Sequence, residues 1–328
     1  MKNKKLKKKF VLIIFGPTGV GKSSFAEQLA THVPSQIVNC DIGQFYKPLS
    51  IGTAKPLNWK TAPIKHNLFD IIDEPKYFSV YEYRKLLFDT VETIWQQDEL
   101  PILVGGSGFY LKSLFFPPFS YDVDLSSIEE RKKMVDKNSW ELLNRIDPKR
   151  AAQIEKNDAY RVQRALEIWK DTGKKPSEYV PEFAFPSDFM LLFLTRDREE
   201  LYNRIDRRLV QMLDEGWIQE VEALMGTEWE PFLEKKKVIG YDVIINYIRR
   251  GKTDAGRQQA IKEIQKKTKN YAKRQITFWR SFERHMKEAL AMCTGMCQGS
   301  GVEGINLTLL DRDLYIKGLL GKLNLLFE

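Results

Sequence analysis

Up to about residue 104, the chain alternates between apolar runs and segments of helical period. The apolar runs have the length of buried strands and lie at Phe10–Phe15, Gln36–Cys40 and Pro101–Val104. A helix is expected at Lys22–Thr31, and a second begins after Ser79, which forms a capping box with Glu82. This second helix has one apolar face, made of Val80, Tyr83, Leu87, Val91 and Ile94. The alternation predicts an α/β fold, a parallel sheet wrapped by helices.

The pattern changes after the run Phe115–Pro118. Residues 119–188 are charged and of helical period, and the next strand is expected only at Phe189–Thr195. We therefore predict a catalytic core from residues 1–118 and 189–328, with a mostly helical insertion at 119–188. Two long helical segments follow, Glu199–Met225 and Asp254–Leu290, and Cys293–Gly304 is interpreted as a loop without assigned chemistry.

The net charge of +8 comes from two short stretches. Residues 1–9 hold six lysines and no acid, and residues 257–284 hold nine Lys or Arg against two acids. The rest of the chain is slightly acidic. Such local basicity indicates a surface that meets a polyanion.

Several classes of protein are excluded by composition. The apolar run Phe10–Phe15 is too short for the core of a signal peptide, and no run approaches the eighteen or so residues needed to span a bilayer. With three cysteines and three histidines, the chain offers neither a disulfide framework nor a convincing zinc site. We expect a cytoplasmic monomer that does not contact a membrane.

The segment Gly16–Ser23, GPTGVGKS, matches G-x-x-x-x-G-K-[ST] and lies between a predicted strand and a predicted helix. Its glycines let the backbone curl around a phosphate chain at a helix N-terminus. Lys22 adds a positive charge, and the Ser23 hydroxyl is a candidate ligand for Mg²⁺. The motif indicates a phosphate chain and does not by itself specify ATP.

Asp41 directly follows the second predicted strand and precedes Gln44 and Tyr46. The carboxyl ends of parallel strands meet at one edge of a sheet, so Asp41 is expected near Gly16–Ser23, the P-loop. There it can bind magnesium or accept a proton; the alternative is a turn cap.

Two glycine-containing segments, Ile51–Pro56 (IGTAKP) and Val104–Leu114 (VGGSGFYLKSL), are weaker signals. Ser107 in the second is a candidate donor to a ligand. Paired glycines at a strand exit are at least as often a sign of tight packing.

Two basic clusters lie on predicted helices. Arg204 and Arg208 are four residues apart and can face one anion, with Arg207 beside them, although a solvated basic face is the commoner explanation. In Tyr271–Arg280, YAKRQITFWR, cations alternate with aromatic residues, so the aromatics can face the core while the cations meet phosphates.

Together these motifs, with Asn157–Ile168 (NDAYRVQRALEI), resemble the bacterial tRNA dimethylallyltransferases in content and order, over about residues 10–285. The resemblance implies a P-loop NTPase-like fold and transfer of a dimethylallyl group from dimethylallyl diphosphate to the adenosine 3′ of the anticodon in tRNA. Magnesium would be the cofactor.

The resemblance also implies residue roles. Asp41 would be the general base, Thr18 would contact the oxygen that bridges to the allyl carbon, and Arg208 would support the diphosphate. The diphosphate would lie on Gly16, Pro17, Thr18, Gly19, Val20, Gly21, Lys22 and Ser23. The tRNA contacts would come from Asp41, Ile42, Gly43, Gln44, Ser107, Tyr160, Arg161, Val162, Gln163 and Arg164, to which the basic pattern adds Lys273, Arg274 and Arg280. Ile42 stands where the family usually has serine.

Two other functions compete with this interpretation. A small-molecule kinase would use the same P-loop for ATP, but it has no need for the basic segment 257–284. A non-catalytic GTPase-like RNA-binding module would need an Asn-Lys-x-Asp segment, which the sequence lacks.

Overall fold

The computed structural model describes residues 5–56, 58–118, 138–293 and 297–328. The chain forms two compact units, one of residues 1–114 and 185–328 and the other of residues 115–184. The second unit begins and ends four residues before the insertion expected at 119–188.

The larger unit is built on a sheet in which every pairing between strands is parallel. Within the described residues its strand order is β3-β2-β4-β1-β5-β6. The strands are β1 (Phe10–Phe15), β2 (Ser35–Asn39), β3 (His66–Asn67), β4 (Leu100–Gly105), β5 (Asp188–Thr195) and β6 (Gly301–Asn306). The predicted α/β fold is confirmed, and the four predicted strands lie within one residue of β1, β2, β4 and β5.

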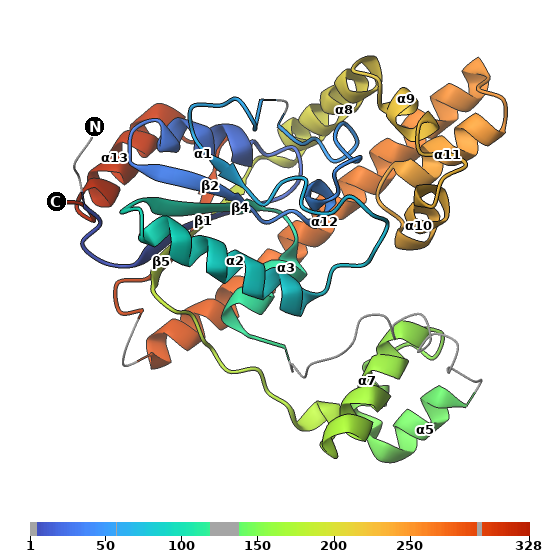
Figure 1. Cartoon of the computed structure of the whole chain (residues 1–328), viewed down its shortest axis with the longest axis horizontal. Helices are drawn as coiled ribbons and strands as arrows, with labels where there is room; N and C mark the ends of the chain where they lie inside the picture. Colours follow the sequence, from blue (N-terminus) through green and yellow to red (C-terminus); the bar gives the residue numbers. More distant parts are fainter. Residues whose placement is uncertain (1–4, 57, 119–137, 294–296) are drawn as a thin grey trace. The chain divides into compact units, whose positions relative to one another are not determined.

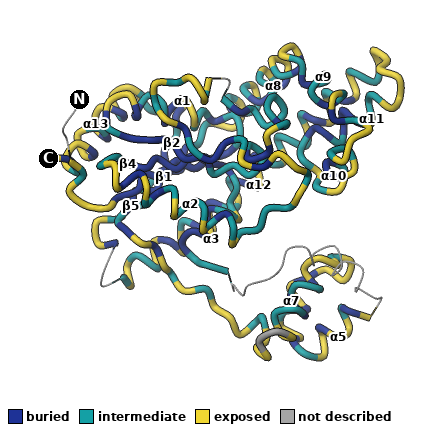
Figure 2. The backbone as a smooth tube through the Cα atoms, viewed as in Figure 1, coloured by how far each residue is buried: buried dark blue, intermediate teal, exposed yellow. Residues whose placement is uncertain are grey.

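Helices cover both faces of this sheet (Figure 1). On one face, Leu12 and Ile14 of β1 belong to a core shared with α1 (Lys22–Ala30), α8 (Arg198–Asp214) and α13 (Arg312–Asn324). The other face packs against α2 (Val80–Trp95), α3 (Gly108–Phe115) and α12 (Asp254–Met292). There the Trp279 ring of α12 stacks on Phe193 of β5, with centroids 4.3 Å apart. The central strands β1, β2 and β4 are buried along their whole length (Figure 2).

The helix expected at Glu199–Met225 is two helices, which corrects the prediction. It stops at Asp214, and α9 (Trp217–Glu222) begins after Gly216, whose φ of 102° is left-handed. A left-handed residue breaks the helical path, and glycine adopts it without steric cost. Two further helices, α10 (Trp229–Lys236) and α11 (Tyr241–Arg249), precede α12.

The smaller unit is helical in its described part and has a core of its own. It contains α5 (Ser139–Ile146), α6 (Pro148–Ala151), α7 (Ala159–Thr172) and the short 3-10 turn η2 (Pro176–Glu178). The buried residues of its hydrophobic core are Leu143, Ala151, Ile154, Val162, Ala165 and Leu166. Residues 119–137, which begin the predicted insertion, lie outside the described residues.

The C-terminal tail is more ordered than the loop expected at Cys293–Gly304. Residues 294–296 lie outside the described residues, and β6 begins at Gly301 beside β5. The prediction missed β6 because this edge strand is half-exposed and carries two glycines and a glutamate, so it lacks an apolar run. In the part of the chain that the structure describes, no helix is long and apolar enough to cross a membrane.

Candidate functional site

The P-loop connects β1 to α1 and has the backbone conformation that its glycines allow. Gly19 and Gly21 have φ angles of 81° and 105°, in the left-handed region. At Gly16, a Cβ atom would lie 2.4 Å from the Leu194 carbonyl oxygen, so only glycine fits. The loop ends at the N-terminus of α1, where free amides and the helix dipole favour an anion.

The side chains of this loop differ in exposure. Pro17 and Val20 are buried, so they offer a ligand their backbone only, whereas Thr18 is half-buried and Ser23 is exposed. The Lys22 Nζ donates to the carbonyl oxygens of Gly16 and Pro17, both at 3.0 Å. The ammonium group therefore lies over the start of the loop, where a phosphate chain would meet it.

Lys22, Asp41 and Arg208 interact electrostatically. Burial lowers the pKa of Lys22 to about 8; the Asp41 carboxylate raises it and the Arg208 guanidinium lowers it further. Burial also lowers the pKa of Arg208, and Asp41 acts against that shift. The site thus combines two cations with one carboxylate, an arrangement that can stabilise an anionic ligand beside a group able to accept a proton.

Asp41 is both a turn cap and a member of this charged group. Its Oδ1 accepts a hydrogen bond from the Gly43 N–H at 3.2 Å, at the start of the 3-10 turn η1 (Ile42–Phe45). Residues 41–44 are all half-buried. The cap interpretation from the sequence is therefore correct but incomplete, because the same carboxylate also acts on the pKa values of Lys22, Arg208 and Tyr271.

The IGTAKP segment forms hydrogen bonds with Gln44 and Arg208, next to Asp41. The Gln44 Nε2 donates to the carbonyl oxygens of Thr53 and Ala54 at 3.1 and 3.2 Å, and an Arg208 Nη2 lies 3.4 Å from the Ala54 oxygen. Glu220 of α9 anchors the segment by accepting hydrogen bonds from three successive amides, those of Ser50, Ile51 and Gly52. The sequence marked this segment without suggesting its partner, since Glu220 is about 170 residues away.

Arg204 and Arg208 do not contact the same carbonyl group. The Arg204 Nε donates to the Gly19 carbonyl oxygen at 2.8 Å, and the Nε of Arg196 donates to that of Val20 at 3.0 Å. Arg196 and Arg204 therefore brace the P-loop backbone, while Arg208 lies near Asp41. No sequence motif singled out Arg196.

The glycines of VGGSG are explained by tight packing. A Cβ atom at Gly105 would lie 2.6 Å from the Cys40 carbonyl oxygen, and one at Gly106 would lie 2.6 Å from the Gln275 side chain. At Gly108 it would lie 2.6 Å from the Phe278 ring. Ser107, between these contacts, is half-buried at the carboxyl end of β4.

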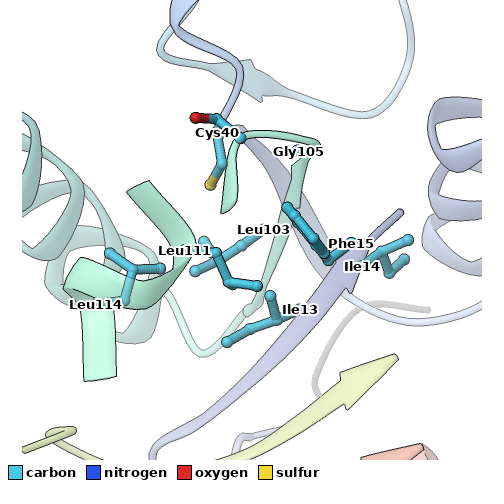
Figure 3. A pocket seen from close by; sticks show the side chains of 9 residues that line it. Ile13, Ile14, Phe15, Cys40, Leu103, Gly105, Leu111 and Leu114 are labelled. Carbon is cyan, nitrogen blue, oxygen red and sulfur yellow. The ribbon is translucent and has the colours of Figure 1, made fainter. Parts of the chain in front are cut away.

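A small pocket lies beneath this strand exit (Figure 3). Besides Cys40 and Ser107, it is lined by buried residues of the sheet and α3, among them Phe15, Leu103 and Leu114. Burial raises the pKa of the Cys40 thiol to about 12, so this cysteine is not a nucleophile at neutral pH. No Lys or Arg lines this pocket, so it offers no cation to an anionic ligand.

The basic part of α12 presents its cations to solvent. Lys273, Arg274 and Arg280 are exposed, and among the described residues none of them forms an ion pair. The neighbouring aromatic rings point inward: Phe278 contacts Phe15 edge-on at 6.3 Å, and Trp279 is 4% exposed. The division of this helix into an aromatic inner side and a cationic outer side agrees with the sequence analysis.

In the smaller unit, the predicted tRNA-contacting residues lie on the first two turns of α7. Tyr160 is 60% exposed, Arg161 is exposed, and Gln163 and Arg164 are half-buried. Val162 is 1% exposed and belongs to the core of the unit, so its side chain is not available to a ligand.

If Lys273 and Arg274 hold tRNA phosphates, replacing both with glutamine will weaken tRNA binding and flatten its salt dependence. Removing one phosphate interaction lowers the slope of log affinity against log salt by about 0.7–0.9. Binding of unmodified tRNA across a salt series measures this slope. The double substitution Lys317→Gln and Lys322→Gln, on the exposed side of α13, removes the same charge as a control. An effect equal to that of the control would mean that the cations of α12 are a solvated face.

A parallel sheet with a P-loop, a carboxylate and an arginine at its carboxyl edge defines a P-loop protein that handles a phosphorylated ligand. Comparison with known proteins makes this class more specific. The family model for IPP transferase matches residues 44–282. The tRNA dimethylallyltransferase of Alkaliphilus oremlandii is 34% identical over 285 residues, which cover 84% of this chain and 90% of the relative.

Two solved structures are similar over nearly the whole chain. The full-length tRNA isopentenylpyrophosphate transferase of Bacillus halodurans is 29% identical, with a TM-score of 0.64 and 97% of each chain covered. A eukaryotic dimethylallyltransferase, captured acting on tRNA, is 25% identical with a TM-score of 0.74, covering 96% of this chain and 78% of its own. The chain belongs to the IPP transferase family.

Proposed function

We propose that the protein transfers a dimethylallyl group from dimethylallyl diphosphate to the exocyclic amine of the adenosine 3′ of the anticodon in tRNA, releasing diphosphate. We further propose that it acts as a monomer in the cytoplasm, where tRNA is available. The observation that carries the proposal is the charged site at the P-loop, where the Lys22 Nζ donates to the Gly16 and Pro17 carbonyl oxygens and Asp41 and Arg208 act on its pKa. The relatives' names support the transferred group and the acceptor class, a dimethylallyl group and tRNA.

The chemistry of the reaction explains why such a grouping is useful. An exocyclic amine of adenine is a weak nucleophile, so the C–O bond of the donor has to break with strong support for the departing diphosphate. Lys22, Arg208 and the amides of the P-loop supply that support. The Thr18 hydroxyl is proposed to contact the bridging oxygen as it takes up the electron pair.

Asp41 completes the reaction as the general base. As the adenine nitrogen bonds to the allyl carbon, the Asp41 carboxylate takes the proton that this nitrogen loses. The acceptor base has to leave its stack to reach the carboxylate, which costs less for a loop nucleotide than for a paired one. Gln44 and Ser107 are proposed to contact the tRNA around this base.

Magnesium fits the residues at this site. Among the described residues, no hydrogen bond occupies the exposed Ser23 hydroxyl, and no group of three or more His, Cys, Asp or Glu forms a cage for a metal. Mg²⁺ commonly binds through one or two protein oxygens together with substrate phosphates. Ser23 would hold it together with oxygens of the diphosphate, and when bound it would neutralise charge on the diphosphate.

The test is to mix the protein with labelled dimethylallyl diphosphate, Mg²⁺ and unmodified tRNA. We expect label in the RNA, dependence on both substrates and no hydrolysis of ATP. ATP hydrolysis without tRNA, and no transfer of label, would replace this proposal with a phosphotransferase.

A further inference from the structure

Gln275 is a buried polar residue of α12 that connects two functional loops. Its side chain is 4% exposed. The Oε1 accepts a hydrogen bond from the Thr18 N–H of the P-loop at 3.0 Å. The Nε2 donates to the Gly106 carbonyl oxygen, at the exit of β4, at 2.6 Å. The side-chain amide of Gln275 thus joins the P-loop, which is proposed to hold the diphosphate, to the exit loop of β4, the residues around Gly106 and Ser107.

The exit loop of β4 is shaped to receive this helix. Any side chain at Gly106 would collide with the Nε2 of Gln275, and any at Gly108 with the ring of Phe278, one turn further along α12. On the preceding turn, Ala272 is fully buried and lets the helix approach closely. Two glycines and one alanine therefore fix the distance at which Gln275 meets both loops.

The neighbours of Gln275 belong to the two proposed substrate sites, one for tRNA and one for the diphosphate. Lys273 and Arg274 directly precede it and are exposed to solvent. On the inner side, the Lys22 Nζ is 3.5 Å from where a Cβ of Gly106 would lie. The hydrogen bonds of Gln275 would consequently set the distance between a tRNA bound along α12 and a diphosphate bound by Lys22.

We propose that Gln275 is a positioning residue, which holds the P-loop and the β4 exit loop at the spacing that transfer requires. The inference rests on the proposed function. A glutamine side chain suits this position because the Thr18 N–H needs one acceptor and the Gly106 carbonyl oxygen needs one donor. Methionine fills similar space with neither bond, while an ionised glutamate can accept but cannot donate.

The first test is Gln275→Met, with Thr268→Val as a matched control. Thr268 lies on the same helix and donates only to the Ile264 carbonyl oxygen within the helix. We expect kcat at saturating substrates to fall roughly 10–100-fold in Gln275→Met, the usual size of a misplacement of reacting groups by about 1 Å. The affinity for tRNA should stay within about twofold, since the cations of α12 are kept.

Gln275→Glu gives a readout that a purely structural role would not produce. A protonated carboxyl group has one donor and one acceptor and so restores both hydrogen bonds. The activity of Gln275→Glu relative to the unchanged protein should therefore rise as pH falls from about 8 to about 5.5, whereas that of Gln275→Met should stay flat. Taking the ratio removes the pH dependence that the two proteins share.

The outcomes separate this inference from the proposed function. If the unchanged protein transfers no label to tRNA, the proposed function fails. Binding of inorganic diphosphate then tests the contact between Gln275 and the P-loop alone. An equal affinity for diphosphate in Gln275→Met and in the unchanged protein rejects a role for this contact. If the unchanged protein is active, the inference is overturned when Gln275→Met keeps kcat within twofold. It is also overturned when the activity ratio of Gln275→Glu is flat with pH.

Discussion

Replacing Asp41 with asparagine is expected to lower the rate of transfer by roughly 10²–10⁴-fold, the usual contribution of a general base. The amide keeps the Oδ1 acceptor for the Gly43 N–H, so the turn that follows β2 retains its cap. The substitution removes the group that takes the proton from the adenine nitrogen. Single-turnover transfer with saturating tRNA and donor measures this step.

The binding of tRNA to Asp41→Asn should remain almost unchanged, because the exposed cations of α12 are not altered. Measuring tRNA affinity beside the rate therefore distinguishes a defect in chemistry from a defect in binding. A variant that keeps more than half of its turnover would show that Asp41 serves as a turn cap only.

Arg208→Gln should lower kcat by roughly 10²–10³-fold, comparable to removing one preorganised donor to a developing negative charge. Arg208 is half-buried and burial lowers its pKa, and a charge in such a place interacts more strongly with a diphosphate than a fully exposed charge does. Affinity for inorganic diphosphate should fall as well. The assay is the same transfer reaction, with diphosphate inhibition as the binding measurement.

Arg207→Gln is the matched control, since it removes the same charge from the adjacent, exposed position of α8. We expect this variant to stay within about twofold of the unchanged protein, as is usual for an exposed charge. Equal losses of activity in the two variants would mean that only the general positive field of α8 matters, and that Arg208 has no specific place at the diphosphate.

The sequence predicted those parts of the molecule that local chemistry determines. Phe10–Phe15 is apolar throughout because both faces of a central parallel strand are buried, so its length and position were evident. Ser79 and Glu82 form the capping box that the sequence indicated. The P-loop glycines likewise have the left-handed conformations for which glycine is needed.

What the sequence could not predict depends on contacts between distant residues. Glu220 holds the amides of Ser50–Gly52, and Gln275 holds the Thr18 amide across 257 positions. A lone glutamate or glutamine in a helix has no pattern that reveals such a partner. The paired glycines at 105 and 106 were ambiguous for the same reason, since the groups packed against them, Cys40 and Gln275, come from elsewhere in the chain.

The protein is proposed to transfer a dimethylallyl group to one adenosine beside the anticodon, with a P-loop that binds diphosphate and does not hydrolyse ATP. The most direct test is to treat unmodified tRNA with the protein, dimethylallyl diphosphate and Mg²⁺, digest it to nucleosides, and identify the product by mass. We expect isopentenyladenosine from tRNA with adenosine 3′ of the anticodon and none when that adenosine is replaced by guanosine. Unmodified nucleosides in both samples, or an equal yield from both, would contradict the account.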